Sequence, residues 1–228
     1  MSTSIKLCNR TFTLTLFGSD FILLRCDDNK SVFPIGEAIY EQHFSFLEEV
    51  IATESEICLK LNAGFKETDL NAMKTIKLSQ ITQGKMHTVP VWFSDSEDWD
   101  HVTSHSQLTK EKVIEQLLQI EFNVAMFGFL PGFVYMGGLP TNLQVPRKSV
   151  PAIKMDPNTL AIGGPYLGIY SLPSPGGWNA IGQIACNIFD VNQSPPILIN
   201  QGDRFRFSAI SHSAFLKIEA QQLSINQL

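Results

Sequence analysis

Alternating apolar and polar residues near the start of the chain predict two short strands joined by a turn. Over residues 11–16, threonine alternates with Phe12, Leu14 and Leu16, so one face of the strand is apolar. Gly18-Ser19-Asp20 is typical of a turn, and residues 21–26 form a second apolar run. We therefore expect two strands, joined by this turn, with one buried face.

The spacing of apolar residues then lengthens, which predicts an amphipathic helix over roughly residues 36–51. The residues that define this helix are Tyr40, Phe44, Leu47 and Ile51. Residues 57–61 alternate again as in a strand, and Thr68 or Asp69 is a suitable cap for a short helix after it. The order strand, strand, helix, strand, helix predicts a small two-layer α+β domain over residues 1–85.

The remaining residues, 86–228, have a different pattern. Residues 87–93 read as a strand, residues 94–106 as a polar loop, and Thr109 as the cap of a helix. Residues 1–127 contain 4 glycines and 2 prolines, whereas residues 128–228 contain 11 and 10. Many short apolar segments separated by Gly/Pro turns predict an all-β barrel or sandwich. The segments are 161–162, 168–170, 185–190, 197–199, 205–207 and 215–218.

Composition excludes several classes of protein. The net charge is -5 and no basic cluster occurs, which argues against a nucleic-acid-binding protein. Apolar runs are too short to span a bilayer, and the first residues do not resemble a signal peptide, so we expect a cytoplasmic protein. The four cysteines lack the spacing of a zinc site and are expected to be buried thiols. They are Cys8, Cys26, Cys58 and Cys186.

The densest group of special residues lies at 128–138, where aromatics alternate with glycine and proline. Such a segment predicts a rigid, shaped loop rather than a regular strand or helix. No P-loop, dinucleotide-binding, zinc-protease or nucleophile-elbow motif occurs. His101 and His105 are interpreted as solvated side chains, and Ser174 as a turn residue without an identifiable base.

Four ordered stretches resemble those of a bacterial family, the B-type subunits of ATP-dependent 5-oxoprolinase. The same family has been labelled allophanate hydrolase subunit 1 and sporulation kinase A inhibitor. The stretches are residues 128–139 (GFLPGFVYMGGL), 146–148 (PRK), 168–178 (GIYSLPSPGGW) and 195–207 (PPILINQGDRFRF). The first 85 residues match only in the order and size of their elements.

The resemblance implies a cyclophilin-like β-barrel over residues 86–228, preceded by a small α+β domain. It also implies a heteromeric complex with a C-type and an A-type subunit, which together open 5-oxo-L-proline, or a related small amide, to L-glutamate at the expense of ATP. In this interpretation the chain is a non-autonomous subunit that does not necessarily bind ATP by itself. The alternative that the resemblance implies is a regulatory protein that inhibits a sensor histidine kinase.

The chemistry of amide opening directs attention to groups that bind phosphate or carboxylate oxygens. Arg147 is the first candidate for a catalytic role because arginine makes planar two-point contacts to such oxygens. Lys154 is the second candidate, with Lys148 a further choice. Glycine-rich backbone, including Gly163, could let N–H groups approach an anion. The candidate substrate-binding residues are Phe129, Pro131, Tyr135, Gly164, Tyr170, Gly176, Gly177 and Trp178.

Several polar or glycine positions of the family pattern differ in this chain. A basic residue of the family's R-x-R doublet is replaced by Ala152, and the second is Lys154. In the family's glycine-rich stretch, a glutamine and a threonine are replaced in this chain by Tyr166 and Leu167, which follow Pro165. Trp92 and Ser94 replace a cysteine and a glycine of the family. The aromatic and turn framework is kept better than the polar set, so the loop at 128–138 indicates architecture and a partner surface first.

Overall fold

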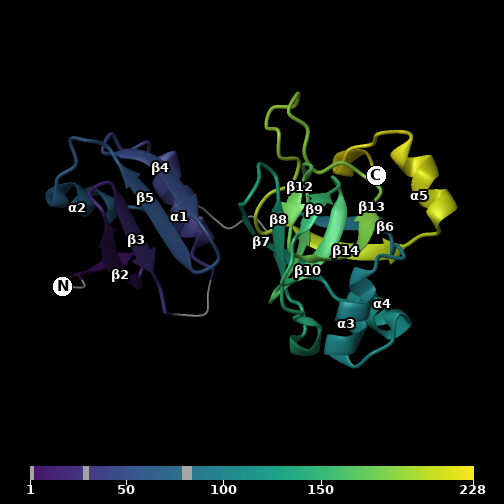
Figure 1. Ribbon diagram of the computed structural model, residues 1–228. Coiled ribbons are helices and arrows are strands. Elements are labelled where there is room, and N and C mark those ends of the chain that lie inside the picture. Colours follow the sequence, from purple (N-terminus) through teal and green to yellow (C-terminus); the bar gives the residue numbers. More distant parts are fainter. Residues whose placement is uncertain (1–2, 28–30, 79–83) are drawn as a thin grey trace. The chain divides into compact units, whose positions relative to one another are not determined.

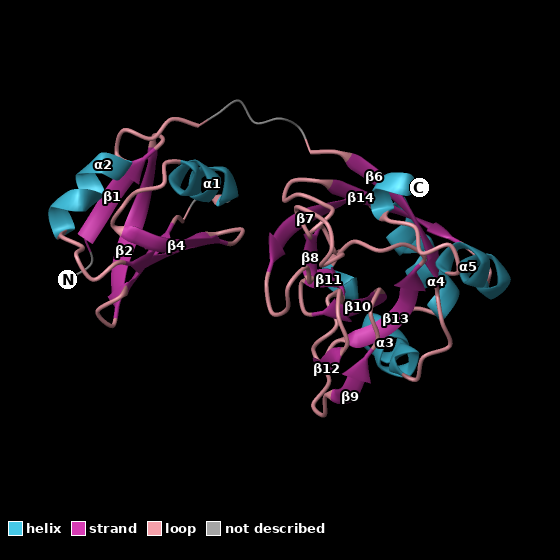
Figure 2. Cartoon of the chain, turned by 90° about the horizontal axis from the view of Figure 1, so that it is seen from above, coloured by secondary structure: helices cyan, strands magenta, loops and turns pink. Residues whose placement is uncertain are grey.

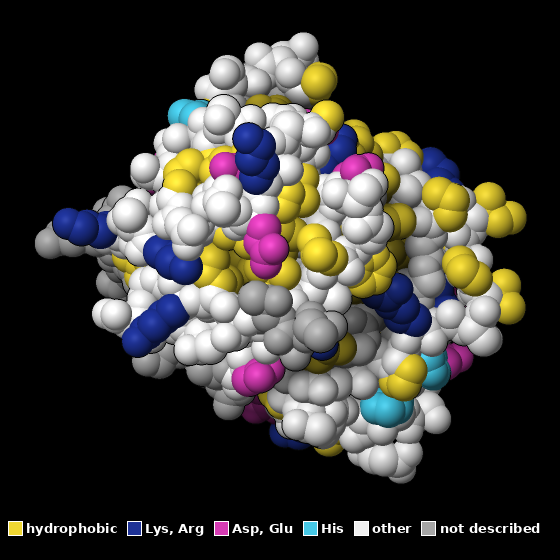
Figure 3. Space-filling view, turned by 90° about the vertical axis from the view of Figure 1, so that its left-hand side faces the viewer, with side chains coloured by type: hydrophobic (Ala, Val, Ile, Leu, Met, Phe, Trp, Pro, Cys, Tyr) yellow, Lys and Arg dark blue, Asp and Glu magenta, His cyan; other side chains and the backbone are white. Residues whose placement is uncertain are grey.

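Two separate hydrophobic cores divide the chain into the units Met1–Thr82 and Gln83–Leu228 (Figure 1). The computed structural model describes residues 3–27, 31–78 and 84–228. Within those ranges, no helix is both long and apolar enough to cross a membrane. On the face drawn in Figure 3, Lys and Arg side chains are scattered among polar and hydrophobic ones rather than gathered into a basic stripe.

The first unit is a five-stranded antiparallel sheet in the order β1-β2-β3-β5-β4. Alternate strand residues, such as Leu14 and Leu59, pack against one side of the helices to form the core. The strands are β1 (Thr3–Leu7), β2 (Arg10–Phe17), β3 (Phe21–Arg25), β4 (Leu47–Ala52) and β5 (Glu56–Leu61). The helices are α1 (Phe33–Glu41) and α2 (Leu70–Met73), the latter preceded by a 3-10 turn at Glu67–Asp69.

The helix expected over residues 36–51 is wrong in its second half. Helix α1 begins near Pro34, which suits the first helical turn, and ends at Glu41. The chain then turns through His43, whose φ of +48° is left-handed and cannot continue a helix. Residues 47–52 instead form β4, which pairs with β5. The apolar residues at 40, 44, 47 and 51 therefore have a helical spacing by coincidence, since they span a helix, a turn and a strand.

The second unit is a closed barrel of seven strands in the order β10-β11-β8-β7-β14-β6-β13. All neighbours are antiparallel except β14 and β6, which are parallel. The barrel strands are β6 (Met86–Trp92), β7 (Phe122–Phe127), β8 (Val134–Gly137), β10 (Thr159–Gly163), β11 (Tyr166–Ile169), β13 (Asn179–Ile184) and β14 (Arg204–Ala209). A two-stranded ribbon of β9 (Ala152–Met155) and β12 (Ser174–Gly176) accompanies it (Figure 2).

Alternation along the strands separates the inside of the barrel from its outside. On β10, Leu160 and Ile162 belong to the barrel core, whereas Ala161 between them belongs to a second cluster of mostly aromatic residues. Likewise Val134 and Met136 of β8 face the barrel core. One side of the barrel therefore carries its own small apolar layer outside the main core.

Three helices accompany the barrel: α3 (Asp98–Ser106), α4 (Lys110–Gln119) and α5 (His212–Glu219). Helices α3 and α4 lie next to each other in both views (Figures 1 and 2). As expected, Thr109 caps α4, because its side-chain oxygen accepts a hydrogen bond from Lys112 N.

Two expectations for the second unit are wrong, and a third holds only in part. Residues 94–106 contain α3 rather than a loop throughout, since Trp99, Val102 and Ser106 bury one helical face. Residues 215–218 belong to α5, because Ser211 caps a helix there and accepts a hydrogen bond from Ala214 N. The segments 185–190 and 197–199 make only isolated bridges, including Phe189 to Ile197.

Candidate functional site

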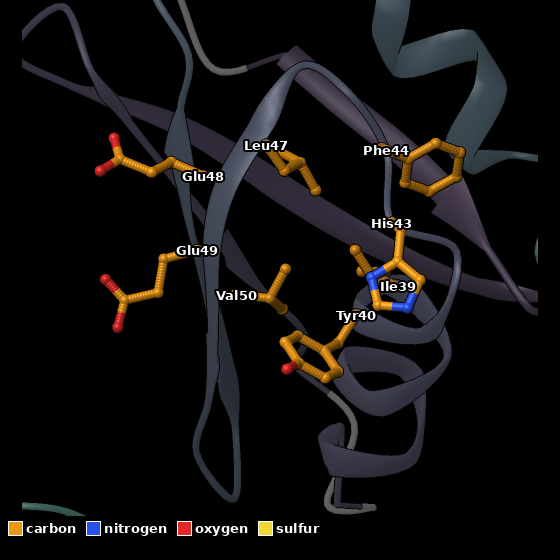
Figure 4. Close-up of a pocket in the computed structure, with 8 residues that line it drawn as sticks. All are labelled: Ile39, Tyr40, His43, Phe44, Leu47, Glu48, Glu49 and Val50. Carbon is orange, nitrogen blue, oxygen red and sulfur yellow. The ribbon is translucent and has the colours of Figure 1, made fainter.

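A shallow hollow in the first unit, with an empty volume of about 310 Å³, has no convergent polar chemistry. Figure 4 shows Tyr40 and His43 on one side of it, while the carboxylates of Glu48 and Glu49 point away from them on the other. Glu48 is also paired with Lys60, at 2.8 Å. The hollow's remaining lining residues are Ile39, Phe44, Leu47 and Val50. Nor do the described residues contain a group of His, Cys, Asp and Glu able to hold a metal ion.

The richest chemistry lies on the outer face of the barrel, in what we call the aromatic cluster. Its members are Phe133, Tyr135, Tyr166, Tyr170 and Trp178. The ring of Phe133 is the hub, with centroids 4.8 Å from those of Tyr135 and Tyr170 and 5.4 Å from that of Trp178. These pairs are edge-to-face, the arrangement that aromatic quadrupoles favour. The cluster joins three sequence-predicted residues that are far apart in the chain.

Glycines allow the cluster to pack directly on the backbone. A Cβ atom on Gly163 or Gly168 would come within 3.0 Å of the Trp178 ring, and one on Gly176 would come equally close to Tyr170. These glycines are thus needed for close approach. Gly164, expected to offer an amide to an anion, donates it to Val145 O at 2.8 Å. That amide is therefore used within the fold and does not face an anion.

The loop over residues 128–133 presents an exposed aromatic residue on a strained backbone. Phe129 is 63% exposed and has a φ of +67°, a left-handed conformation that is costly for a bulky residue. Its ring makes an edge contact with Phe133 at 5.6 Å. A hydrogen bond that Ser171 Oγ donates to Pro131 O, at 2.6 Å, holds the loop in place. The predicted loop is therefore found over residues 128–133, but the prediction is wrong for residues 134–137, which form strand β8 because Val134 and Met136 pack into the barrel core.

Arg147 lies beside the aromatic cluster. Its guanidinium carbon is 5.7 Å from the Trp178 ring centroid, a cation–π contact. The residue is exposed, and within the described ranges no carboxylate pairs with it. An arginine held on an aromatic face with its donors open to solvent can bind a carboxylate or a phosphate. Arg147 is therefore the sequence-predicted residue whose geometry best fits its expected role.

The two lysine candidates have partners of their own. Lys148 Nζ contacts both carboxylate oxygens of Asp98, at 2.9 and 2.7 Å. Lys154 is exposed and pairs with Asp156 at 2.7 Å. Among the described residues, no hydrogen bond or ion pair joins Lys154 to Arg147 or to the aromatic cluster, although Ala152 and Met155 of the same strand pack against that cluster. The structure thus places Arg147 on the aromatic candidates, whereas the Lys154 side chain is exposed and paired with Asp156.

Burial keeps the phenols of Tyr135 and Tyr170 neutral. It raises the pKa of Tyr135, and the charge of Arg147 opposes this only in part. It also raises the pKa of Tyr170, against a hydrogen bond from the Trp178 backbone and the charge of Arg147. Both groups therefore act as hydroxyl groups and not as bases. Ser174 is no activated nucleophile either, since its Oγ is buried without a hydrogen-bond partner.

Sequence reasoning missed two residues beside the site, Asp98 and Asn179, and gave a third, His101, no role in it. Asp98 binds Lys148, and His101 Nδ1 lies 2.7 Å from Asn179 Oδ1. Asn179 is fully buried next to Trp178. The helical spacing of Trp99, Val102 and Ser106 was the available signal for α3, and with it for Asp98 and His101. His101, interpreted as a solvated side chain, is exposed but hydrogen-bonded.

Comparison with known proteins gives matches of sequence and of fold. Residues 6–199 match the model of the carboxyltransferase domain, subdomain C and D. The chain is 40% identical over 106 residues to the B-type subunit of 5-oxoprolinase from Escherichia coli O157:H7, covering 46% of this chain and 49% of the relative. It is 38% identical over 127 residues to the protein of that name from Haemophilus influenzae, covering 55% and 60%. The matched region thus spans about half the length of these relatives.

Solved structures agree with the fold. The protein TTHA0988 superposes with a TM-score of 0.74 at 26% identity, covering 84% of this chain and 40% of that one. Kluyveromyces lactis urea amidolyase has a TM-score of 0.72 at 16% identity, covering 99% and 16%, which shows a shared fold alone. The sequence matches identify the family, which the shared fold by itself does not. The chain belongs to the family of the carboxyltransferase domain, subdomain C and D, and within the matched region it is similar to the B-type subunits of bacterial 5-oxoprolinase.

Proposed function

We propose that this chain is a non-autonomous subunit of an ATP-dependent 5-oxoprolinase-type complex, in which Arg147 binds an anionic group beside a partner protein. The structural observation that supports the proposal is the exposed Arg147 guanidinium on the Trp178 ring. The similar proteins also share the name of a 5-oxoprolinase subunit. A carboxylate of 5-oxo-L-proline or of a related small amide fits the planar donors of this group.

The surroundings of Arg147 favour a contact surface over a closed catalytic pocket. The rings of Phe133, Tyr170 and Trp178 are buried and packed, so they fill the space behind Arg147. Phe129, by contrast, is exposed on a loop whose conformation costs free energy. The Phe129 ring contacts Tyr170, with centroids 6.4 Å apart, and the charge of Arg147 also acts on Tyr170. An exposed aromatic residue and an exposed arginine around one aromatic cluster are the composition that protein interfaces favour. We therefore assign the surface formed by Phe129 and Arg147 to contact with a different protein of the complex, with the C-type subunit as the first candidate.

ATP fits this surface poorly. A triphosphate is bound by several converging donors, as in phosphate-binding loops. Among the described residues near the aromatic cluster, Lys148 is paired with Asp98 and the Gly164 amide is bonded to Val145, which leaves Arg147. We infer that ATP binds elsewhere in the complex and that this chain supports the opening of the cyclic amide, whose resonance makes unassisted attack by water slow.

The decisive experiment is to co-express the chain with homologues of the A-type and C-type subunits and to measure ADP release that depends on 5-oxo-L-proline. We expect such release from the three-component complex and none from the chain by itself. A well-assembled complex without 5-oxo-L-proline-dependent ADP release contradicts the proposal. The same preparation tests the contact surface, because Phe129→Ala should then weaken co-purification of the C-type subunit.

A further inference from the structure

The side chain of Asn179 is buried completely and uses its whole amide group in hydrogen bonds. Nδ2 donates to Pro146 O at 2.9 Å and to Ile162 O at 3.0 Å, while Oδ1 lies 2.7 Å from His101 Nδ1. Because carbonyl oxygens only accept, Nδ2 must face the two carbonyls and Oδ1 must accept from His101. The proton of the imidazole is thus on Nδ1, so His101 is a donor in this network.

Asp98 makes a second set of contacts from the same face of α3. It lies three residues before His101, the spacing that places two side chains side by side on a helix. One oxygen of its carboxylate, Oδ2, accepts from Ala180 N at 2.7 Å and from Lys148 Nζ at 2.7 Å. Both Asp98 and Lys148 are largely shielded from solvent, with side chains 16% and 19% exposed. This pair is therefore screened less than a surface salt bridge.

All of these contacts converge on the residues that flank Arg147. Val145 O accepts from Gly164 N at 2.8 Å, and Pro146 O accepts from Asn179. On the other side, Lys148 N donates to Gly177 O at 2.7 Å, and its side chain binds Asp98. The backbone on both sides of Arg147 is thus fixed by the residue after β10, by Gly177 and the first residue of β13, and by α3. The guanidinium itself lies over the Trp178 ring.

We propose that Asn179, Asp98 and His101 are positioning residues that hold the 145–148 segment so that Arg147 meets its anion in a fixed place. The inference rests on the proposed function in one respect, namely that Arg147 binds an anionic group. A cation fixed before binding loses less conformational freedom when the anion arrives, which raises affinity without any new contact. Neither Asn179 nor His101 needs to touch that anion.

The first test is hydrogen exchange on the full chain, and it does not depend on any activity. In Asn179→Asp, the new carboxylate cannot donate to Pro146 O or Ile162 O. We expect the amides of Lys148 and Gly164 to exchange about tenfold faster than in the unsubstituted chain, as for loss of buried hydrogen bonds. The amide of Val124, which donates to Asp203 O elsewhere in the barrel, is the internal control and should not change. Unchanged exchange at Lys148 and Gly164 overturns the proposal.

Two further substitutions keep the test sharp if Asn179→Asp does not fold. Asp98→Asn keeps the shape of the side chain but removes the charge that holds Lys148. His101→Gln keeps a side-chain donor for Asn179 Oδ1, whereas His101→Ala removes it. We expect faster exchange at Lys148 in Asp98→Asn and at Gly164 in His101→Ala, with His101→Gln close to the unsubstituted chain. Equal exchange in all three variants and the unsubstituted chain overturns the positioning role.

The second test asks whether the network positions Arg147 or only stabilises the fold. In the assembled complex, Arg147→Ala should regain part of its lost ADP release when guanidinium ion is added, because the fixed segment still frames the vacated place. The double variant Arg147→Ala with Asn179→Asp should regain none. Equal rescue of both variants contradicts positioning by Asn179. If the unsubstituted complex has no activity, the proposed function fails, but hydrogen exchange still decides the positioning role.

Discussion

Arg147 and Trp178 form a cation–π pair, with the guanidinium carbon 5.7 Å from the ring centroid. The two residues come from different parts of the barrel unit and meet because Asn179, the neighbour of Trp178, binds the carbonyl of Pro146, the neighbour of Arg147. The pair places a fixed positive charge on an apolar surface without burying it. This arrangement favours an anion that arrives together with apolar surface, as it does at an interface.

Replacing Arg147 by alanine should reduce activity with only a small loss of stability. We expect kcat/KM of the complex to fall roughly ten- to a hundredfold, as for the loss of a hydrogen bond to a charged group. The free energy of unfolding should fall by no more than about 1 kcal/mol, since the side chain is exposed and loses only the cation–π contact with Trp178. Arg147→Lys is the matched control: it keeps the charge but not the planar donors and should fall in between. Full activity in Arg147→Ala would remove this residue from the site.

A methyl group at Gly163 should destabilise the barrel unit. Its Cβ atom would lie within 3.0 Å of the buried Trp178 ring, so Gly163→Ala should cost about 1–3 kcal/mol. Gly177→Ala is the control, because its Cβ atom would have 3.7 Å to its nearest neighbour. Urea unfolding followed by tryptophan fluorescence reports on this unit, since Trp92, Trp99 and Trp178 all lie in it. Equal midpoints for the two variants would contradict the packing argument.

The left-handed backbone at Phe129 makes a prediction that separates strain from packing. Phe129→Ala and Phe129→Gly both lose the ring contact with Phe133, but glycine also relieves the φ of +67°. We expect the glycine variant to be more stable than the alanine variant by about 1 kcal/mol. The same fluorescence-detected unfolding measures this difference. An alanine variant at least as stable as the glycine variant would show that the loop carries no such strain.

Cys186 should be unreactive and should make stability depend on alkaline pH. Burial raises the pKa of its thiol from 9.0 to about 12, so the folded state holds this proton more tightly than the unfolded state does. The stabilising contribution is therefore complete below about pH 8 and is lost as the pH rises from about 9 towards 12. Cys186→Ala should flatten that loss in a pH series of urea unfolding.

Alkylation of the folded chain provides the corresponding kinetic measurement. At pH 8, iodoacetamide should label the partly exposed Cys58 before the buried Cys186, with mass spectrometry identifying the sites. Labelling of the unfolded chain gives the reference rate for each thiol. Cys186 reacting as fast as Cys58 in the folded chain would contradict the burial described above.

Many strands and several site residues could be predicted from the sequence because their signals are local. Residues 11–16, 21–26 and 57–61 all lie mainly in strands, and Thr109 caps α4, since alternation and capping act over a few residues. It could not show that α1 ends at Glu41, because a single left-handed residue, His43, breaks a pattern that remains periodic. Nor could it reveal Asn179, whose role depends on carbonyls that are distant in the chain.

The parallel pairing of β6 with β14 sets an order of events while the chain is being synthesised. The first unit has all five of its strands once Leu61 has been made, so its sheet can form early. β6 pairs with β14, beginning at Met86 and Arg204, and β14 also pairs with β7. The edges of β6 and β7 therefore stay unpaired until β14 has been made. A ribosome that stalls before Arg204 would thus release a barrel with two open edges, which are prone to pair with other chains.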